Sequence, residues 1–255
     1  MAQSRLLIPI VTAVALLAGV PRHAPTQRAQ ADPPPVTQDA PAVSSGCIAT
    51  GAQVRRAATT TRKVVALTFD DGPSDFTPAI LRVLGANNVP ATFFEIGRNM
   101  ARREDLMRQI IAAGDEIGDH TYDHVDLPPL STTKVRDELS KTQAKILRAT
   151  GFHTCLFRPP HGLYNTRTNT IARKLGLLTV MWSVDTKDFT MPGTDAIYQS
   201  AVDGAKPGAI ILMHEGGGNR SETVAALPRI IATLEERGYQ FQTVSQLLGL
   251  RSVRR

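Results

Sequence analysis

The segment VVALTFDDGPS, residues 64–74, decides the fold of this chain. Its first six residues form a short apolar run, which indicates a buried strand, and Gly72 and Pro73 then stop that strand in a tight turn. Asp70 and Asp71 lie at this turn, and the side chains of adjacent residues point in different directions. One carboxylate can therefore bind a metal ion while the other holds a water molecule, instead of both repelling each other in one pocket. The alternative is an Asp-Gly turn that only closes the strand.

Short apolar runs of this kind alternate with helical patterns along residues 64–250. The later expected strands are ATFFEI, EIGD, CLF, LLTVMWSV, AIILM and FQTV, and the expected helices are 77–87, 99–113, 132–149, 167–175, 195–205 and 223–237, before a short terminal helix. The helix at 132–149 carries one apolar stripe, made of Val135, Leu139, Thr142 and Ile146. No phosphate-binding glycine fingerprint follows the first strand, so an open doubly wound sheet is the weaker alternative. The pattern predicts an α/β fold, an incomplete (β/α) barrel of about seven parallel strands.

Composition and charge limit the classes of protein that this chain can represent. Over 255 residues, 42% hydrophobic and 20% charged, it can bury one substantial core. The net charge of +6 is concentrated at the start, because residues 1–63 carry seven Lys/Arg and two Asp/Glu, and residues 64–255 carry 22 and 21. The folded part therefore lacks the basic stripe of a phosphate-binding surface, and we expect no nucleic-acid partner.

The N-terminal region predicts export to the cell envelope or secretion. Arg5, the apolar run 6–20 and Ala-Gln-Ala at 29–31 follow the order of a signal peptide. Eleven residues separate the run from that cleavage site, so an uncleaved membrane anchor is the alternative for residues 1–31. Residues 32–63, rich in Pro, Ala, Thr and Ser, are expected to form a low-complexity linker or tail, which leaves 64–250 as the catalytic domain.

Ionisable residues follow four further strands, in DHTYDH (119–124), FRPPHG (157–162), WSVDTKDF (182–189) and ILMHEGGG (211–218). His120 and His124, four residues apart, can lie on one face of a helical turn, and two imidazoles with one carboxylate make an open zinc site. Two incidental histidines on a solvated loop are the alternative. Arg158 can orient a nearby carboxylate. Because the loops of a β/α barrel converge at the carboxyl ends of its strands, the five motifs predict one active site there.

In this order, TFDDGP, HTYDH, RPPHG, DTKDF and LMH resemble the motifs of the NodB-like polysaccharide deacetylases, carbohydrate esterase family four, over residues 64 to about 248. The resemblance implies a distorted β/α barrel with a divalent metal ion, usually zinc and sometimes cobalt. By the same match, the metal ligands are Asp71, His120 and His124.

The resemblance also assigns the proton transfers. Asp70 looks like the base that deprotonates the attacking water, and Arg158 looks like its partner. His214 looks like the acid that protonates the leaving amine, and Asp188 matches the carboxylate that keeps this histidine protonated. Leu212 is similar to the apolar residue that lines the acetyl pocket.

Three positions depart from the usual family pattern: His161 replaces Tyr, Asp119 replaces Asn and Phe189 replaces Trp. In the family, the oxyanion meets the backbone N–H at position 161, which a side-chain change leaves intact. His161, Phe189 and Leu212 are therefore the expected substrate contacts, and these departures bear on substrate preference.

The resemblance implies a metal-dependent hydrolase that removes N-acetyl groups from an acetylated envelope polysaccharide, either peptidoglycan or a chitin-like glycan. An O-acetyl esterase of the xylan type and an inactive glycan-binding protein are the alternatives, and the intact motif residues argue against the second. No feature of the sequence specifies an oligomeric state.

Cys47 and Cys155 are the only two cysteines of the chain. In an exported protein an even number of cysteines favours pairing, so we predict a disulfide between the N-terminal extension and the fourth strand. Two unrelated thiols are the alternative.

Overall fold

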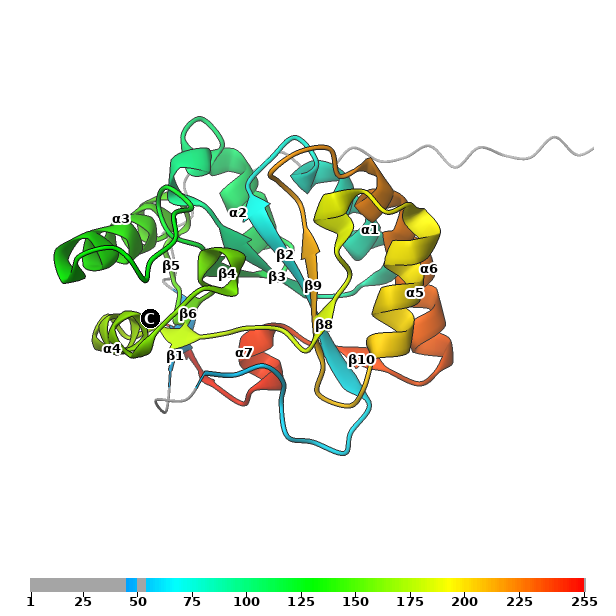
Figure 1. Cartoon of the computed structure of the whole chain (residues 1–255). Coiled ribbons are helices and arrows are strands. Elements are labelled where there is room, and N and C mark those ends of the chain that lie inside the picture. Colours follow the sequence, from blue (N-terminus) through cyan, green and yellow to red (C-terminus); the bar gives the residue numbers. More distant parts are fainter. Residues whose placement is uncertain (1–44, 50–53, 255) are drawn as a thin grey trace, which may run out of the picture. The chain divides into compact units, whose positions relative to one another are not determined.

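The computed structural model describes residues 45–49 and 54–254. Its main sheet is a curled layer of parallel strands in the order β7-β6-β4-β3-β2-β9-β8 (Figure 1). These strands are β2 (Val64–Gly72), β3 (Ala91–Glu95), β4 (Glu116–Asp119), β6 (Leu156–Phe157), β7 (Leu178–Thr179), β8 (Val184–Asp185) and β9 (Ile210–His214). A further short strand, β10 (Gln240–Phe241), pairs with the start of β2. The predicted incomplete barrel of about seven parallel strands is confirmed.

The barrel is open between β7 and β8, which follow each other directly in the chain. The sequence pattern predicts LLTVMWSV as one strand, and this prediction is wrong because the segment pairs with both ends of the sheet. Val180 N–H donates to Phe157 O at 2.8 Å on one side, and Ser183 N–H donates to Ile210 O at 3.0 Å on the other. One backbone stretch cannot stay in both ladders, so the strand divides and its middle crosses the gap.

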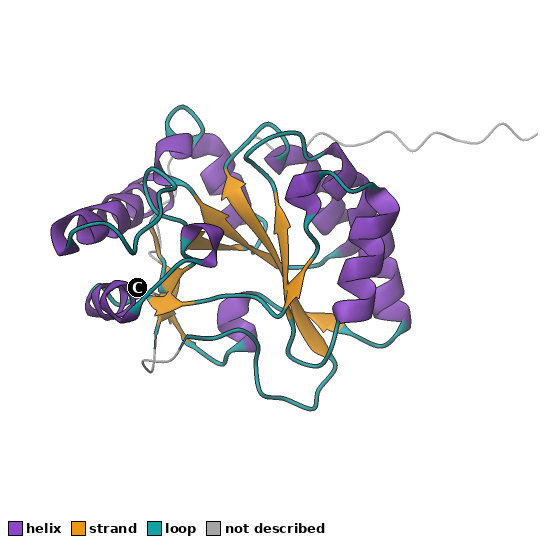
Figure 2. Cartoon of the chain, viewed as in Figure 1, coloured by secondary structure: helices purple, strands orange, loops and turns teal. Residues whose placement is uncertain are grey.

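Seven α-helices surround the curled sheet in the described part of the chain (Figure 2). They are α1 (Thr77–Asn87), α2 (Glu104–Ala112), α3 (Thr132–Thr150), α4 (Thr166–Lys174), α5 (Thr194–Gly204), α6 (Ser221–Glu236) and α7 (Val244–Leu247). The predicted apolar stripe of α3 is confirmed, since all four of its residues are buried. This helix begins after Ser131, whose side chain accepts from Lys134 N–H, and ends at Gly151, which has a φ of 69°.

The helix expected at 99–113 is shorter than the pattern predicts. Residues Gly97–Met100 form a 3₁₀ turn, η1, and α2 begins only at Glu104. Arg102 has a φ of 65° between them, which a continuous helix does not allow. Two other 3₁₀ turns, η2 (Pro160–Gly162) and η3 (Asp188–Thr190), lie in the loops that follow expected strands.

Alternation along β2 decides where its side chains point. Val65, Leu67 and Phe69 belong to the larger core cluster, which includes residues of α1 and α6. Val64 and Ala66 belong to a second cluster, together with residues of β3, β6 and β9. Because side chains alternate between the faces of a strand, Asp70 continues the face of Val64 and Ala66 and points into the barrel. Both faces are covered, which explains why the whole run is apolar.

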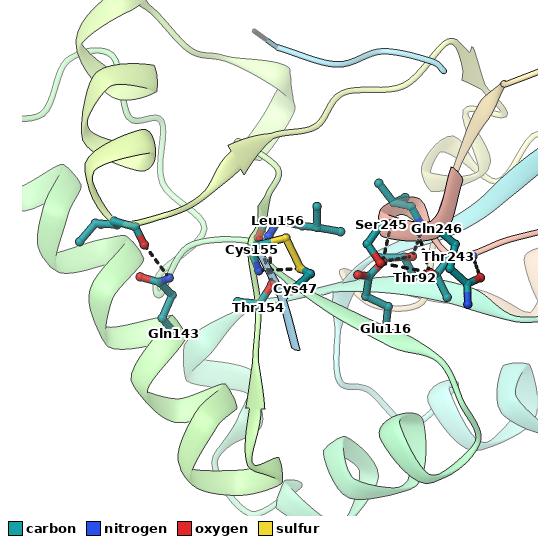
Figure 3. Close-up of a disulfide and its surroundings, with 12 residues drawn as sticks. Cys47, Thr92, Glu116, Gln143, Thr154, Cys155, Leu156, Thr243, Ser245 and Gln246 are labelled. Atoms are coloured by element: carbon teal, nitrogen blue, oxygen red, sulfur yellow. Dashed lines mark hydrogen bonds between the residues drawn. A yellow bond between two sulfur atoms is a disulfide. The ribbon is translucent and has the colours of Figure 1, made fainter. Parts of the chain in front are cut away.

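A second sheet joins the N-terminal segment to the domain. It has the order β11-β1-β5, with β1 (Ser45–Ile48), β5 (Phe152–His153) and β11 (Arg251–Arg254). Beside it, Cys47 and Cys155 form a disulfide, with 5.3 Å between their Cα atoms (Figure 3). Part of the segment that composition assigns to the linker therefore packs on the domain.

Most of the predictions for the N-terminal region concern residues before Ser45. The expected signal peptide or anchor, 1–31, and most of the linker lie outside the described residues. Among the residues that are described, no helix is both long enough and apolar enough to cross a membrane.

Candidate metal and active site

All five motifs meet at the carboxyl ends of the parallel strands, around one cavity of about 250 Å³. The cavity is lined by Asp70, His120, His124, Pro159, His161, Trp182, Asp185, Phe189, Leu212 and His214. The remaining predicted site residues lie behind this lining and contact it, namely Asp71, Arg158 and Asp188. The structure thus brings together every site residue that the motifs predict. The sequence missed Trp182, whose only signal is its place in the last apolar run before DTKDF.

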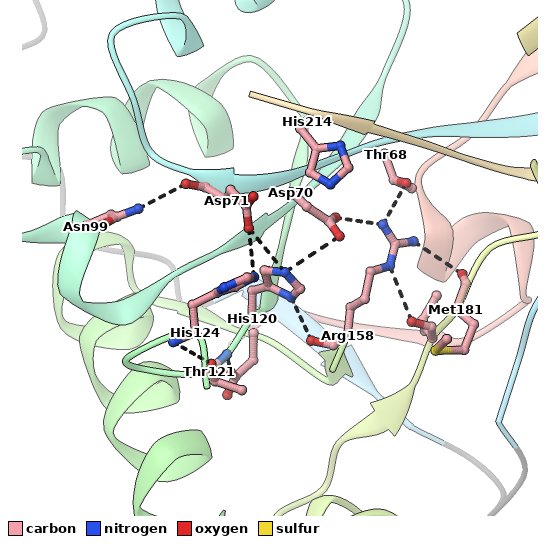
Figure 4. A network of polar contacts seen from close by, with 12 residues as sticks. Thr68, Asp70, Asp71, Asn99, His120, Thr121, His124, Arg158, Met181 and His214 are labelled. Atoms are coloured by element: carbon pink, nitrogen blue, oxygen red, sulfur yellow. Dashed lines mark hydrogen bonds and ion pairs between the residues drawn. The ribbon is translucent and has the colours of Figure 1, made fainter. Parts of the chain in front are cut away.

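Asp71, His120 and His124 form a compact group of candidate metal ligands (Figure 4). Oδ1 of Asp71 lies 3.4 Å from Nε2 of His120 and 3.1 Å from Nε2 of His124. One ligand atom from each residue falls within 4.8 Å of the other two. His120 Nδ1 lies 2.7 Å from the carbonyl oxygen of Arg158, so Nδ1 carries the proton and the Nε2 lone pair faces Asp71.

A divalent cation fits this group. Asp71 Oδ1 is buried, and among the described residues the imidazole nitrogens of His120 and His124 are the polar groups that face it. Burial alone would raise the pKa of Asp71, but the interactions with His120 and His124 outweigh burial and hold this pKa well below its usual range. The result is an ionised carboxylate that faces imidazole nitrogens, a donor set that suits zinc.

Backbone strain gathers at the same end of the barrel. Asp71, Thr121, His124 and His161 have φ values of 75°, 67°, 56° and 54°. Non-glycine residues keep such left-handed conformations only where their surroundings hold them, and they cluster at functional sites. Thr121 is held by its N–H, which donates to Asp119 Oδ1 at 2.7 Å. Asp119 is itself fully buried, and burial raises its pKa well above the usual range.

Asp70 is held by a buried arginine. Arg158 Nη1 donates to Asp70 Oδ1 at 2.7 Å and to Thr68 Oγ1 at 2.9 Å. The Nε and Nη2 groups donate to the carbonyls of Val180 and Met181, each at 3.3 Å, so the guanidinium also holds the start of the segment that crosses from β7 to β8. Burial lowers the pKa of Arg158 and the ion pair with Asp70 opposes this, but an arginine stays charged in proteins.

His214 is held by Asp188. Its Nδ1 lies 2.7 Å from Asp188 Oδ1, and its backbone N–H donates to Asp188 Oδ2 at 2.7 Å. Thr223 Oγ1 donates to the same Oδ2. Burial alone would lower the pKa of His214, but the hydrogen bond and charge of Asp188, together with the charges of Asp70 and Asp71, outweigh burial and raise this pKa. His214 therefore keeps its proton to higher pH than a free histidine.

The mouth of the cavity is apolar on one side and polar on the other. Phe189 is 51% exposed, and its ring lies edge-on to His214 with 5.4 Å between the centroids. His161 pairs through Nδ1 with Asp126 Oδ1 at 2.8 Å, and its ring lies 4.9 Å from that of His124. Asp126 belongs to none of the five motifs, so this pair was not predictable from the sequence.

Comparisons with known proteins agree with this geometry. A family model described as polysaccharide deacetylase matches residues 57–180. The peptidoglycan-N-acetylglucosamine deacetylase of Bacillus cereus is 40% identical over 189 residues, which are 73% of this chain and 88% of that protein. The chitooligosaccharide deacetylase of a Bradyrhizobium species is 37% identical over 197 residues, 72% of this chain and 90% of that protein. A solved carbohydrate esterase family 4 pseudoenzyme from Bacillus anthracis is similar with a TM-score of 0.73 and 33% identity, over 78% of this chain and 70% of that one.

An open β/α barrel with ionisable side chains around a cavity at the carboxyl ends of its strands defines a class of enzymes that have their active site at that end. Within that class the chain belongs to the polysaccharide deacetylase family, which confirms the resemblance of its motifs.

Proposed function

We propose that this chain is a metal-dependent deacetylase that hydrolyses the N-acetyl groups of N-acetylglucosamine units in an envelope polysaccharide. This proposal rests on the close grouping of Asp71, His120 and His124. Beside this group lie the carboxylate of Asp70, which is paired with an arginine, and the imidazole of His214, which is paired with an aspartate. Peptidoglycan is the favoured polymer and a chitin-like glycan the second, since relatives named for both substrates are similar to this chain.

Asp71, His120 and His124 would hold the metal ion, with zinc as the first choice and cobalt as the second. When bound, a divalent ion polarises the amide carbonyl and lowers the pKa of water. Three protein ligands leave room for water and substrate, which is how catalytic zinc sites differ from structural ones.

Asp70 is the general base for the attacking water. Arg158 occupies its Oδ1, so Oδ2, 3.7 Å from His120 Nε2, is the oxygen left to accept the proton. Arg158 acts by fixing the orientation of this carboxylate. Water adds to the carbonyl carbon of the acetamide, and one of its protons passes to Asp70.

His214 is the general acid. Its Nδ1–H stays with Asp188, so Nε2–H is the group that can donate to the amide nitrogen. Protonation of this nitrogen breaks the C–N bond and releases acetate and a free amine. The raised pKa of His214 keeps the acid form available near neutral pH.

The rest of the cavity binds the substrate. Leu212, only 3% exposed, forms the apolar wall for the acetyl methyl group. The backbone N–H of His161 stabilises the oxyanion. The left-handed φ of this residue sets the direction in which that N–H points. The side chains of His161 and Phe189 contact the sugar at the rim.

The domain that performs this reaction spans residues 64–250, after an export segment at 1–31 and a linker at 32–63. Activity at the envelope or outside the cell follows from such a segment.

The fold by itself does not decide activity, because the similar Bacillus anthracis protein is described as a pseudoenzyme. What favours turnover here is the complete set of Asp70, Asp71, His120, His124 and His214 in one cavity.

Acetate release from N-acetylglucosamine oligomers, peptidoglycan and acetylated xylan tests the proposal. We expect release from the first two substrates, loss after chelation, and recovery with added zinc. Release from acetylated xylan alone would identify an O-acetyl esterase, and no release from any substrate would identify a glycan-binding protein.

A further inference from the structure

The side chain of Asn99 links the 3₁₀ turn η1 to the candidate metal ligand Asp71. Asn99 Nδ2 donates to the backbone carbonyl of Asp71 at 2.9 Å (Figure 4). Asp71 needs such support for two reasons. Its φ of 75° is a left-handed conformation that aspartate keeps only when contacts hold it.

The second reason is that Asp71 is the bulged residue of β2. The register of β2 against β3 passes from Asp70 opposite Phe94 to Gly72 opposite Glu95, so Asp71 has no partner residue on β3. A bulge leaves its extra residue out of the ladder and re-aims its side chain. The Asn99 amide therefore binds Asp71, a residue that has no partner in the pairing of β2 with β3.

The backbone of η1 is bound to the loop that carries the two candidate histidine ligands. Gly97 N–H donates to Thr121 O at 2.9 Å, and Arg98 N–H donates to Tyr122 O at 3.0 Å. Both carbonyls lie within residues 120–124, between the two histidines. Glycine is required at position 97, because a Cβ there would lie 2.6 Å from the Tyr122 ring. This close approach fixes η1 against the histidine loop.

We infer that Asn99 is a positioning residue that sets the place of the Asp71 carboxylate relative to His120 and His124. The turn η1 is attached to the histidine loop by its backbone and to Asp71 itself by one side chain, while the backbone N–H of Ile96, just before η1, donates to the next residue, Gly72. Without the Asn99 amide, the Asp71 turn loses this link, and its carboxylate is no longer held at a fixed distance from the imidazoles. The inference rests on the proposed function, since the link matters only if these three residues bind a metal ion.

Asn87 offers a matched control in the same chain. Its Nδ2 donates to the backbone carbonyl of Val83 at 2.7 Å, the same type of bond, at an exposed site near the end of α1. Asn99→Ala, Asn99→Leu and Asn87→Ala would be prepared in the full chain. Leucine keeps the branched shape of asparagine without a donor, so it separates the lost hydrogen bond from lost packing.

Three quantities would be measured on each variant: the zinc Kd by competition with a chromophoric chelator, the visible spectrum of the cobalt-loaded protein, and the thermal midpoint without metal. Loss of a residue that orients a ligand typically weakens metal binding by about 10- to 100-fold. We expect this loss, with a changed cobalt spectrum, in both Asn99 variants. Asn87→Ala should bind zinc as tightly as the parent.

The outcomes separate this inference from the proposed function. If both Asn99 variants bind zinc like the parent, the positioning role is overturned, even if their thermal midpoints fall. Normal binding by Asn99→Leu with weak binding by Asn99→Ala would also overturn it, because packing would then be the cause. If the parent chain binds neither zinc nor cobalt, the proposed function fails instead.

Discussion

Asp70 and His214 occupy partner positions on the adjacent parallel strands β2 and β9. Neighbouring strands lie about 4.8 Å apart, so the sheet itself fixes the spacing of the proposed base and acid. Each is then supported from behind, Asp70 by Arg158 and His214 by Asp188. The two proposed proton-transfer groups therefore belong to paired strands, while the candidate histidine ligands come from the loop after β4.

Asp188→Asn should shift the alkaline limb of the pH profile to lower pH. In the parent, burial lowers the pKa of His214, and the hydrogen bond and charge of Asp188 are the largest of the contributions that raise it. Without the carboxylate charge, His214 loses its proton at lower pH, and the acid form needed for catalysis disappears earlier. The measurement is kcat/KM for acetate release across pH. Asp195→Asn, the same substitution at an exposed ion pair on α5, should leave the profile unchanged, and an unchanged profile in Asp188→Asn would contradict the role of this pair.

Asp70→Asn and Asp71→Asn should both release less acetate than the parent, but for different reasons. Asp71→Asn should bind zinc weakly and regain part of its activity in excess zinc by mass action. Asp70→Asn should keep its metal and lose about 10² to 10⁴ in rate, because it lacks the base. Metal content and acetate release would be measured on both purified proteins. If Asp70→Asn loses the metal and Asp71→Asn keeps it, the assigned roles are reversed.

Arg158→Met should lower the free energy of unfolding by about 3–5 kcal/mol, because it leaves Asp70 as a buried charge without a partner. Adding Asp70→Asn to this variant should recover part of the loss, since the unpaired charge is then removed. Denaturant unfolding of the two single variants and the double variant measures this coupling. Strictly additive effects would show that the pair contributes no interaction of its own.

The disulfide between Cys47 and Cys155 should protect both thiols from alkylation in the unfolded, unreduced protein. The two residues are 108 positions apart, and closing a loop of this length contributes about 4 to 5 kcal/mol in the chain-entropy model. The double variant Cys47→Ser, Cys155→Ser should therefore unfold at lower denaturant concentration. Two freely alkylated cysteines in the parent would contradict the pairing.

Much of the fold was predictable because local patterns and tertiary structure agree. The run in β2 is apolar throughout because both faces of the strand are covered, and the stripe on α3 lies against the core. The division of LLTVMWSV was not predictable, since it depends on which strands form the two ends of the sheet. The cysteine count predicted that Cys47 lies beside Cys155, but no pattern predicted that the residues around Cys47 form a strand paired with β5 and β11.

The motifs predicted the candidate site residues better than their supports. Asp70, Arg158 and His214 carry recognisable patterns at strand ends, where loops of a barrel converge. Asn99 carries no such pattern, because its bond to Asp71 spans 28 positions and exists only once β2 and β3 are paired. Thr223, in α6, likewise contacts Asp188 across 35 positions. Contacts of this kind depend on tertiary neighbours that a linear pattern does not encode.

The central claim is that one metal ion held by Asp71, His120 and His124 makes this cavity a deacetylase. The most direct test is a titration of the metal-free chain with zinc, following zinc binding and acetate release from N-acetylglucosamine oligomers in the same samples. The account predicts that both signals rise together and reach saturation at one zinc per chain, whereas Asp70→Asn binds zinc without releasing acetate. Acetate release by the metal-free chain, or saturation with zinc without any acetate release by the parent, would contradict it.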